Sequence, residues 1–475
     1  MQLGEIARII GADWKSEALG AVEPIGYSID SRTIKPGELF FAIRGENVDG
    51  NKFVGDALGK RACAAVIAQD ATEVPVDVDD NRLLRVSDTL VALQQLAHKV
   101  LQDWNRPLVA ITGSAGKTTT KDLTALLLSA QYSVLKTAGN LNNAYGLPLS
   151  ILKLVSDGHK ATDFDLIVLE MGMNHAGEIR DLCKIAPPTV GVVTIVAPVH
   201  LEFFDSIDGI ADAKAELIES LGPTGLAVLN ADDPRVIRMR ERHSGPVRTY
   251  GIENQADVIA TEIEPVGLSQ ISFRLRTPSG NARVVMPLIG RHNLYNALAA
   301  AAVADHFNVT PGAIADVLGK AEPSKMRGQV LRFADGFTVI DDSYNSNPRA
   351  LNEMLKSVGH MPDFKRRIAV LGEMLELGPA GPEMHRDSGH RVVAEGMDIV
   401  IGVRGLAKQI VEGAIEQGLP AEQAHFCEDS ETAAKLVLDT IREGDIVLVK
   451  GSRGVKTDVV VSRLKEKFSL VDEVE

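Results

Sequence analysis

Cysteine is scarce in this chain of 475 residues, which contains three, Cys63, Cys183 and Cys427. Three thiols that lie far apart in the sequence match neither a disulfide framework nor the spacing of a metal site. We therefore expect them to be small buried apolar residues in a reducing compartment. The sequence also lacks any run of about 18 consecutive apolar residues, and its start shows no basic region followed by an apolar one. These absences predict a cytoplasmic protein without membrane insertion.

Positive charge is in deficit. Lysine and arginine total 50 against 64 for aspartate and glutamate, so the formal net charge is −14 at pH 7. A chain this acidic is not expected to bind nucleic acid or an anionic membrane surface broadly. Its partners are expected to be small molecules, and any anionic substrate must be held by local clusters of positive charge.

Internal repeats and low-complexity tracts are absent as well. The length corresponds to about three domains of ordinary size, and 45% hydrophobic with 24% charged residues is typical of globular proteins. The patterns divide the chain into α/β units at residues 1–85, 86–322 and 323–475. A helix over 88–101, apolar on one face, is expected to join the first unit to the second. The predicted fold class is therefore α/β with three domains.

Strands are predicted from two kinds of pattern. Residues 164–170 and 189–196 are continuous apolar runs, as expected of parallel strands that are covered on both faces. Residues 246–290 contain alternating segments instead, which predict an antiparallel insertion or edge. In the third unit, short apolar runs predict strands at 338–340, 367–371, 399–401 and 445–449.

The most informative segment is Ile111–Thr120, with the sequence ITGSAGKTTT. An apolar strand enters a glycine turn here and a helix follows, so backbone N–H groups and the helix dipole face one point. Lys117 is placed to reach the terminal phosphates of a nucleotide, and the Thr118 hydroxyl to hold Mg²⁺. Ile111 stands where the standard pattern has its first glycine. The segment predicts a P-loop that binds ATP or GTP, against the alternative of a chance Gly-Lys-Thr turn.

Three side chains further along the chain are candidates for the same site. Glu170 ends a buried strand and His200 follows the next one, so both are expected where the P-loop opens, at the carboxyl edge of the sheet. A carboxylate there suits Mg²⁺, although it could also face solvent, and a lone histidine is often structural. Lys214 lies in the apolar stripe of a helix. It must snorkel, pair or change its charge, for example by carbamylation.

Several motifs, in their order along the chain, resemble the Mur ligases of peptidoglycan synthesis. The motifs cover essentially the whole chain: 112–119 (TGSAGKTT), 139–148 (GNLNNAYGLP), the glutamate at 170, 200–202 (HLE), 213–216 (AKAE), 290–300 (GRHNLYNALAA) and 326–329 (MRGQ). Two more, 341–348 (DDSYNSNP) and 371–378 (LGEMLELG), resemble the family members that add D-Ala-D-Ala to UDP-MurNAc-tripeptide.

The resemblance implies an N-terminal UDP-substrate-binding domain, a central P-loop ATPase domain and a C-terminal Rossmann-like domain that binds the incoming dipeptide. It implies ATP-dependent peptide ligation through an acyl phosphate, with ATP and Mg²⁺ as cofactors and UDP-MurNAc-tripeptide and D-Ala-D-Ala as small-molecule substrates. We expect the protein to act as a monomer.

The resemblance also implies roles for residues of the ATP site. The phosphates would be cradled by Gly113, Ser114, Ala115, Gly116, Lys117, Thr118 and Thr119, with Thr118 on a first Mg²⁺. Glu170 and His200 would bind a second metal ion, which Lys214 would support as a carbamate.

Further roles are implied around the nucleotide itself. Asn293 and Asn296 would approach adenine, for which plain packing of an alanine-rich helix is the alternative. Arg327, from the third domain, would reach the phosphates. Asp342 would contact the ribose, although the adjacent Asp341 leaves this position open by one residue.

Substrate-binding residues are implied in the first domain. The residues that match the UDP site of the family are Ser28, Ser31, Arg32, Phe41 and Arg44. Hydroxyl groups and arginine forks suit a diphosphate, and the ring of Phe41 would flank the uracil. Taken alone, these residues indicate only a turn and an edge strand, and Asn51 stands where the family pattern usually has histidine.

Other substrate contacts are implied in the second and third domains. Asn142 and Asn143 lie in a glycine-rich loop that suits substrate hydroxyl, amide or phosphate groups. D-Ala-D-Ala would be held by Tyr344, Asn345 and Asn347. Lys450, Ser452 and Arg453 follow a buried strand and would meet a carboxylate or phosphate, with surface solvation as the alternative.

Alternative functions remain open at this point. Two are amide ligases of the same fold: one that adds a diamino acid to the dipeptide, and a folylpolyglutamate synthetase. The diamino-acid ligase usually carries Asp-Asn-Pro-Arg in its third domain, which this chain lacks. A more distant alternative is a P-loop NTPase that switches a protein partner. No residue identifies itself as the general base for the amine. The third peptide residue is left open between lysine and meso-diaminopimelate.

Overall fold

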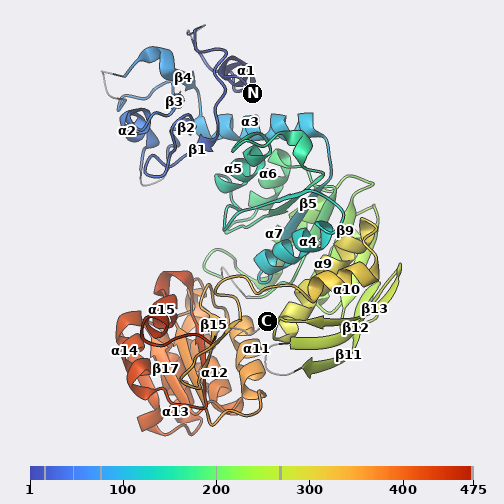
Figure 1. Ribbon diagram of the computed structural model, residues 1–475, viewed down its shortest axis with the longest axis vertical. Helices are drawn as coiled ribbons and strands as arrows, with labels where there is room; N and C mark the ends of the chain where they lie inside the picture. The colour runs from blue at the N-terminus through green and yellow to red at the C-terminus, as the bar shows by residue number, and fades with distance from the viewer. Residues whose placement is uncertain are drawn as a thin grey trace.

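The structure, a computed structural model, describes residues 1–14, 16, 18–45, 48–74, 78–198, 201–266 and 270–471. Within these ranges the chain forms three β-sheets, each built from one consecutive part of the sequence. In Figure 1 the N-terminal domain lies at the top, the central domain at the right and the C-terminal domain at the bottom left. The predicted α/β fold with three domains is confirmed. No helix in the described ranges is long and apolar enough to cross a membrane.

The N-terminal domain has a four-stranded sheet in the order β1-β2-β3-β4, in which all neighbours are parallel. Its elements are α1 (Leu3–Ile9), β1 (Tyr27–Ser28), β2 (Leu39–Phe41), α2 (Val54–Gly59), β3 (Ala64–Ala68) and β4 (Leu83–Val86). Every residue of β2 and β3 is buried, which explains their unbroken apolar sequences LFF and AAVIA.

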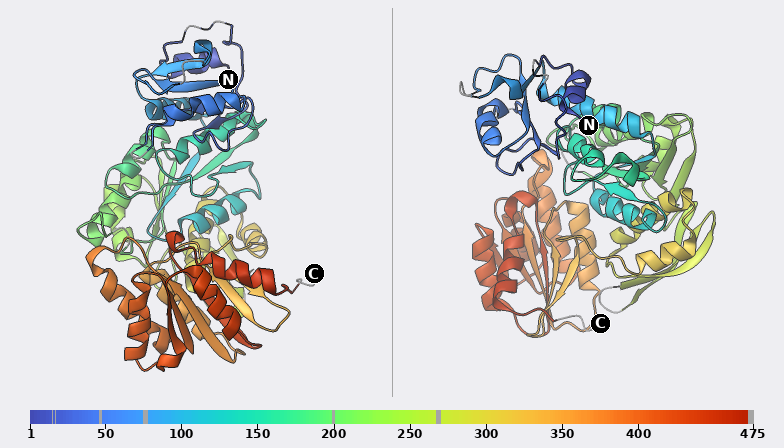
Figure 2. Two further views of the ribbon diagram at one scale, coloured as in Figure 1. Left: turned by 90° about the vertical axis from the view of Figure 1, so that its left-hand side faces the viewer. Right: turned by 45° about the horizontal axis from the view of Figure 1, so that its top comes forward.

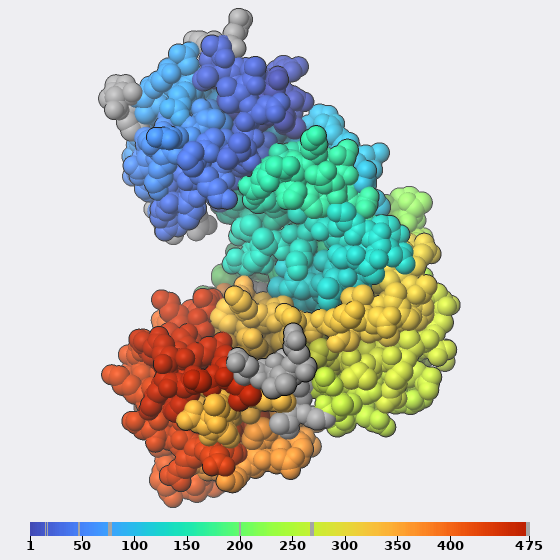
Figure 3. All heavy atoms as spheres, viewed as in Figure 1, coloured from blue at the N-terminus to red at the C-terminus, as the bar shows by residue number. Residues whose placement is uncertain are grey.

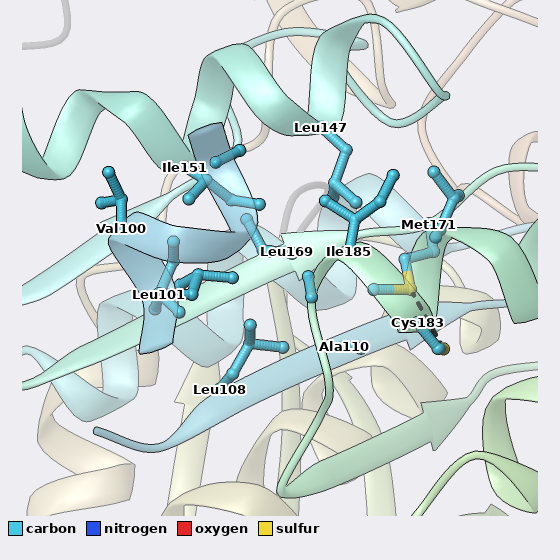
Figure 4. Packing of buried hydrophobic residues seen from close by; sticks show 14 of the residues in the cluster. Val100, Leu101, Leu108, Ala110, Leu147, Ile151, Leu169, Met171, Cys183 and Ile185 are labelled. Atoms are coloured by element: carbon cyan, nitrogen blue, oxygen red, sulfur yellow. Dashed lines mark hydrogen bonds between the residues drawn. The ribbon is translucent and has the colours of Figure 1, made fainter. Parts of the chain in front are cut away.

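Helix α3 (Thr89–Trp104) connects this domain to the central one, as the sequence predicts. The Asp88 side chain caps its N-terminus, and Asn105 ends it in a left-handed conformation. Val100 and Leu101 on this helix belong to a buried apolar cluster, and Figure 4 shows them beside residues of the central domain. The same cluster also includes residues of the N-terminal sheet. The two domains therefore share one core through α3.

The central domain has a nine-stranded sheet in the order β13-β12-β11-β10-β9-β8-β5-β7-β6. Its elements are β5 (Leu108–Thr112), α4 (Lys117–Leu128), β6 (Val134–Lys136), α5 (Gly146–Leu152), β7 (Leu166–Glu170), α6 (Glu178–Ile185), β8 (Val190–Val193), α7 (Ile207–Glu219), β9 (Leu226–Asn230), α8 (Pro234–Arg238), β10 (Val247–Gly251), β11 (Val258–Val266), β12 (Gln270–Thr277), β13 (Gly280–Met286), α9 (Arg291–His306) and α10 (Pro311–Leu318).

The antiparallel part of this sheet is smaller than the sequence predicts. Strands β11, β12 and β13 pair antiparallel and form the predicted edge. Strand β10 also lies within the predicted antiparallel range, but it pairs parallel with β9 and with β11, so the prediction is wrong for this strand. The reason is that α8 crosses over between β9 and β10, and a strand reached through a crossover helix returns in the same direction.

The C-terminal domain has a six-stranded sheet in the order β14-β15-β19-β16-β17-β18, in which β14 is the antiparallel strand. Its elements are β14 (Gln329–Arg332), β15 (Thr338–Asp342), α11 (Pro348–Gly359), β16 (Arg366–Gly372), α12 (Gly381–Ala394), β17 (Ile399–Val403), α13 (Ala407–Glu416), β18 (Ala424–Cys427), α14 (Ser430–Thr440), β19 (Asp445–Lys450) and α15 (Asp458–Lys467).

Helices cover both faces of this sheet. Neighbouring residues such as Val339 and Ile340 belong to two different buried clusters, one on each face. Four of the strands lie where the continuous apolar runs of the sequence predict them. The left-hand view of Figure 2 shows the N-terminal, central and C-terminal domains following one another along the long axis.

Two histidines predict how stability depends on pH. Burial lowers the pKa of both His292 and His385 from the usual value of 6.5. The unfolded chain then binds more protons than the folded one just below pH 6.5, so the free energy of unfolding falls as the pH drops through this range. We expect a loss of up to about 1.4 kcal/mol per pH unit for each histidine.

Urea denaturation at pH 7.5, 6.5 and 5.5 measures this dependence. Asparagine or glutamine in place of each histidine is expected to flatten the curve, because these side chains do not titrate. Equal stability of the wild type at the three pH values would contradict the prediction.

Candidate active site

A cavity of about 1340 Å³ opens beside the P-loop, and residues of all three domains line it. Gly45 and Gln94 reach it from the N-terminal side, and Arg327 and Tyr344 from the C-terminal domain. The space-filling view in Figure 3 shows the molecule hollowed between its N-terminal and C-terminal domains. Ligands that enter this cavity can therefore contact three domains at once.

The glycines of the P-loop are required by their surroundings. Gly113 has φ +147° and Gly116 has φ +80°, both in the region that favours glycine. A Cβ atom on Gly113 would lie 1.8 Å from Oγ1 of Thr194, and one on Gly116 would lie 2.3 Å from Oδ1 of Asn296. The loop 113–116 thus lies tightly between the end of β8 and α9, and α4 begins directly after it, so the N–H groups of the first turn of α4 open toward the loop.

Lys117 is the first residue of α4 and lies in the cavity wall. Its Nζ donates a hydrogen bond to the Gly113 carbonyl at 2.8 Å. Burial lowers the pKa of Lys117; Glu170 opposes this shift and Arg327 adds to it. A bound anion would stabilise the charged form of a lysine that is buried in this way, because the attraction offsets the cost of removing the charge from water.

Thr118 and Glu170 come together on the same side of the loop. Oγ1 of Thr118 donates to Oε2 of Glu170 at 2.7 Å, and the amide of Asn142 donates to Oε1 at 2.7 Å. Only 3% of Glu170 is exposed, so its carboxylate is oriented by two fixed donors. Hydroxyl and carboxylate oxygens beside a phosphate loop are the donor set that Mg²⁺ prefers, and the two residues fit such an ion.

The sequence predicts two further residues, His200 and Lys214, at the metal site. His200 lies outside the described residues. Within the described part of the chain, no group of three or more His, Cys, Asp or Glu side chains is placed to hold a metal ion. A divalent cation at Thr118 and Glu170 would therefore take its remaining ligands from substrate oxygens or water.

Lys214 lies in the middle of α7, where 2% of it is exposed. Burial and the nearby Lys117 hold the pKa of its amine well below the usual range. Among the described residues, no hydrogen bond or ion pair involves this amine, and it does not line the cavity. The sequence predicts its place in an apolar stripe, and the structure excludes the alternative that it snorkels to the surface.

The C-terminal domain contributes an arginine to the P-loop. Nη2 of Arg327 donates to Oγ1 of Thr118 at 3.1 Å. The guanidinium group also stacks on Tyr344, with Cζ 4.0 Å from the ring centroid. Arg327 therefore joins two domains at the point where the phosphates are expected.

The adjacent aspartates 341 and 342 have different surroundings. Asp341 is 4% exposed, accepts a hydrogen bond from its neighbour Ser343, and has its pKa raised by burial. Asp342 lines the cavity and accepts a hydrogen bond from Nζ of Lys450 at 2.5 Å. Of the two, Asp342 is the one that can meet a ribose, as proposed from the sequence.

Several predicted substrate contacts also have structural roles. Oδ1 of Asn347 caps α11 by accepting the Ala350 N–H, and Oδ1 of Asn143 accepts the Gly146 N–H at the start of α5. Asn345 lines the cavity, and its carbonyl accepts a hydrogen bond from Lys450. For Asn347 and Asn143 the amide N–H₂ group is the part that stays available to a ligand.

Ser452 and Arg453 also line the cavity. Ser452 is buried and accepts the Leu375 N–H at 3.0 Å. Arg453 is 55% exposed in its side chain and pairs with Asp458 at 3.1 Å. Both residues follow the end of β19 and lie at the cavity, as the sequence predicts. Ser452 already has a hydrogen-bond partner within the protein, and Arg453 has an ion-pair partner.

The predicted UDP residues do not line this cavity. Arg32 is exposed and pairs with Asp30, and Arg44 pairs with Asp70 at 3.1 Å. Ser28 lies in β1, and Ser31 is buried in the turn that follows.

The structure does not support the predicted contact between the Phe41 ring and uracil. Phe41 has no exposed surface and packs in the apolar cluster beneath the N-terminal sheet. A ring with both faces covered offers nothing to a base, so Phe41 supports the core in this structure. The sequence LFF has three apolar side chains in a row, and it does not show which of them a sheet will bury.

Asn293 and Asn296 lie one turn apart at the start of α9 and line the cavity. The Asn296 carbonyl oxygen accepts a hydrogen bond from Thr120 at 3.2 Å, and the amide of Asn293 donates to the Ile289 carbonyl at 2.8 Å. Both are almost fully buried. Asn296 therefore lies against the P-loop, and contact with adenine stays a prediction.

Some cavity residues were missed by the sequence analysis. His292 has a buried Nδ1 atom with no hydrogen-bond partner in the described structure, and it belongs to the motif at 290–300. The Tyr295 hydroxyl in the same motif donates to Asp232 at 2.8 Å. Their place in a recognised motif was a usable signal. No sequence signal marked Asp232, because it follows β9 in a loop that matches none of the motifs.

A P-loop domain whose first helix is contacted by an arginine from a further α/β domain is typical of multidomain ATP-dependent enzymes. Models of the Mur ligase family match consecutive parts of the chain: the family's catalytic domain over residues 25–100, the Mur ligase middle domain over 111–304, and the glutamate ligase domain over 326–453. The chain belongs to the Mur ligase family.

Similar proteins agree with this assignment. The UDP-N-acetylmuramoyl-tripeptide--D-alanyl-D-alanine ligase of Bacillus subtilis (strain 168) is 32% identical over 93% of this chain and 93% of its own length. The ligase of the same name from Escherichia coli (strain K12) is 34% identical over 92% and 93%. The crystal structure of MurF from Acinetobacter baumannii matches with a TM-score of 0.86, 29% identity and 98% coverage of both chains. MurF ligase from Thermotoga maritima in complex with ADP matches with a TM-score of 0.79 and 27% identity, over 93% and 97%.

Proposed function

We propose that this protein joins D-alanyl-D-alanine to the terminal carboxylate of UDP-N-acetylmuramoyl-tripeptide, with ATP as energy source and Mg²⁺ as cofactor, to form the UDP-MurNAc-pentapeptide used for peptidoglycan. The observation that carries this proposal is the contact between Arg327 of the C-terminal domain and Thr118 of the P-loop helix, in a cavity lined by three domains. Such a cavity suits a reaction in which ATP and two other substrates must meet. The proposal includes action as a monomer in the cytoplasm.

The chemistry requires activation of a carboxylate. A free carboxylate is a poor electrophile, so the γ-phosphoryl group of ATP is first transferred to the tripeptide carboxylate, which gives an acyl phosphate and ADP. The amine of D-Ala-D-Ala then attacks the acyl carbon, and phosphate leaves from the tetrahedral intermediate. Each step concentrates negative charge, so catalysis depends mainly on fixed positive groups and dipoles.

The residues of the cavity supply these groups. Lys117 and the N–H groups at the start of α4 face the phosphates, and Arg327 approaches from the opposite domain. Stacking on Tyr344 orients the Arg327 guanidinium before the substrates bind. The hydrogen bond from Lys450 orients the Asp342 side chain at the cavity wall, where it suits the hydroxyl groups of a ribose.

Thr118 and Glu170 are the residues that would hold Mg²⁺. Mg²⁺, when bound, neutralises charge on the phosphates. Asn142 binds the other oxygen of Glu170 and so directs one carboxylate oxygen toward Thr118. The arrangement orients the carboxylate without leaving either oxygen unsatisfied.

Product analysis tests the proposal. The protein is incubated with Mg-ATP, D-Ala-D-Ala and UDP-MurNAc-tripeptide that ends in either lysine or meso-diaminopimelate, and the products are weighed by mass spectrometry. We expect UDP-MurNAc-pentapeptide, ADP and phosphate in equal amounts, and the preferred tripeptide identifies the third residue. The Lys117→Ala variant is the control and is expected to form no product.

Other outcomes would favour the alternatives. Absence of pentapeptide with both tripeptides, together with ligation of a free diamino acid or glutamate, would assign the chain to a sister ligase. ATP hydrolysis that needs neither peptide substrate would favour a switch NTPase.

A further inference from the structure

The motif at 371–378 has no role in the mechanism above, although it forms part of the cavity wall. It begins in the last two residues of β16 and continues into the loop that follows, where its side chains divide into two sets. Met374 and Leu377 are 1% and 3% exposed and belong to a buried cluster of the C-terminal domain. Leu375 lies between them, is 41% exposed, and lines the cavity. The segment therefore anchors two apolar side chains, of which Leu377 also borders the cavity, and presents a third, exposed one to the site.

Two hydrogen bonds fix the backbone at Met374 and at Leu375 itself. The Met374 N–H donates to Nε2 of His385 at 2.9 Å, and the Leu375 N–H donates to Oγ of Ser452 at 3.0 Å. The acceptors come from α12 and from the loop after β19, so the segment is held from two directions. A main chain that is held by hydrogen bonds at two consecutive N–H groups places the Leu375 side chain in a defined position.

His385 is suited to this task because it is a neutral acceptor. It has no exposed surface, and Nδ1 lies 2.6 Å from the Gly381 carbonyl. A carbonyl only accepts, so Nδ1 carries the proton and Nε2 is left free to accept the Met374 N–H. Burial favours the same neutral form.

The segment also meets the central domain. Gly378 has φ +58°, and a Cβ atom there would lie 3.1 Å from the Leu201 carbonyl oxygen. The wall that carries Leu375 is thus held within the C-terminal domain and also packs against the central domain. Its position does not depend on an exposed, unsupported loop.

Much of the surrounding lining is polar or charged, and it includes Tyr344, Asn345 and Arg453 from the same domain. Leu375 and Leu377 give this lining an apolar component, and the exposed side chain of Leu375 makes it accessible, which favours ligands with methyl groups. The substrate that the C-terminal domain is proposed to receive, D-Ala-D-Ala, carries one methyl group on each residue.

We propose that Leu375 is a specificity-determining contact for the methyl groups of the incoming dipeptide, and that His385 is the positioning residue that holds it in place. This inference rests on the proposed ligase function. It predicts that the apolar wall discriminates between dipeptides with and without methyl groups.

Steady-state kinetics with D-Ala-D-Ala and D-Ala-Gly test the contact. One methyl group in an apolar contact corresponds to about fourfold in kcat/KM, so the wild type is expected to favour D-Ala-D-Ala by at least this factor. Leu375→Ala is expected to raise the KM for D-Ala-D-Ala about three- to tenfold and to reduce the discrimination, with KM for ATP unchanged. Ile415→Ala is the matched control, because Ile415 is equally exposed, at 41%, but lies on α13 away from the cavity.

The positioning role of His385 needs a readout beyond stability. His385→Ala is expected to lower discrimination as Leu375→Ala does, whereas His385→Gln, which keeps an acceptor, is expected to restore part of it. A purely structural role would lower the melting temperature and leave the ratio of kcat/KM values unchanged. If His385→Ala does not fold, Ser452→Ala removes the other anchor of the segment and is expected to lower the ratio in the same way.

The outcomes separate the inference from the function on which it rests. Unchanged discrimination in Leu375→Ala, or a rise in KM for UDP-MurNAc-tripeptide alone, would overturn the inference while the ligase function stands. A wild type that ligates neither dipeptide would overturn both.

Discussion

Replacement of Lys214 by alanine is expected to abolish ligation, with a loss of at least about 10²–10³-fold in kcat. The protonated amine would be a buried cation beside another cation, Lys117, with no partner among the described residues. The neutral amine is therefore the favoured form, and a neutral amine can attack CO₂. The reaction forms a carbamate and releases one proton. In place of the unpaired amine, the carbamate presents a carboxylate group that can pair with Lys117.

Chemical rescue distinguishes this carbamate from a lysine that only fills space. Short carboxylic acids such as formate or acetate, at tens of millimolar, are expected to restore part of the activity of Lys214→Ala, because they supply the missing carboxylate. Initial rates of phosphate release, measured with and without these acids, provide the test. Removal of CO₂ and bicarbonate from the buffer is expected to lower the activity of the wild type.

Lys121 provides a matched control. It is also 2% exposed, but its amine donates to the Thr137 carbonyl at 2.8 Å and therefore has a hydrogen-bond partner, which Lys214 lacks among the described residues. Lys121→Met is expected to lose stability without any rescue by carboxylic acids. Full activity of Lys214→Ala, or equal rescue of both variants, would refute the carbamate.

The central part of the site could be predicted from the sequence, because residues that are consecutive in the chain form it. Strand, glycine turn and helix occur in order at 111–120, and they fold into a loop between β5 and α4. The position of Glu170 could be predicted for a similar reason. The carboxyl end of a parallel strand beside the P-loop lies at the same edge of the sheet as the loop. The family prediction, which rests on such blocks, is confirmed by the domain matches along the chain.

Other features depended on packing that a single sequence does not reveal. Phe41 is covered on both sides in its sheet, whereas the motif alone allowed an exposed ring. Asn347 resembles a substrate ligand in sequence, yet its Oδ1 atom caps α11. The choice between Asp341 and Asp342 required the alternation of β15, which turns one side chain into the domain and the next toward the cavity.

Substitution of Arg327 is the second change for which we expect a large effect. Arg327→Ala is expected to lower kcat about 10³-fold, since an arginine that meets a transferring phosphoryl group from another domain contributes about this much. Arg327→Lys keeps the charge but loses the planar fork and the stacking on Tyr344, and we expect it to recover only a small part of the rate. The effect should fall mainly on kcat, because the interaction strengthens as charge develops in the transition state.

Arg332 is a suitable control, because it is an exposed arginine five residues further along, at the end of β14. Arg332→Ala is expected to retain nearly full activity. Small-angle scattering adds a second test: nucleotide and substrate should compact the wild type, and Arg327→Ala should compact less, if this side chain links the two domains in the closed state. A rise in KM for ATP with unchanged kcat would show instead that Arg327 binds the ground state, and the contact with Thr118 would then position the nucleotide without accelerating the transfer.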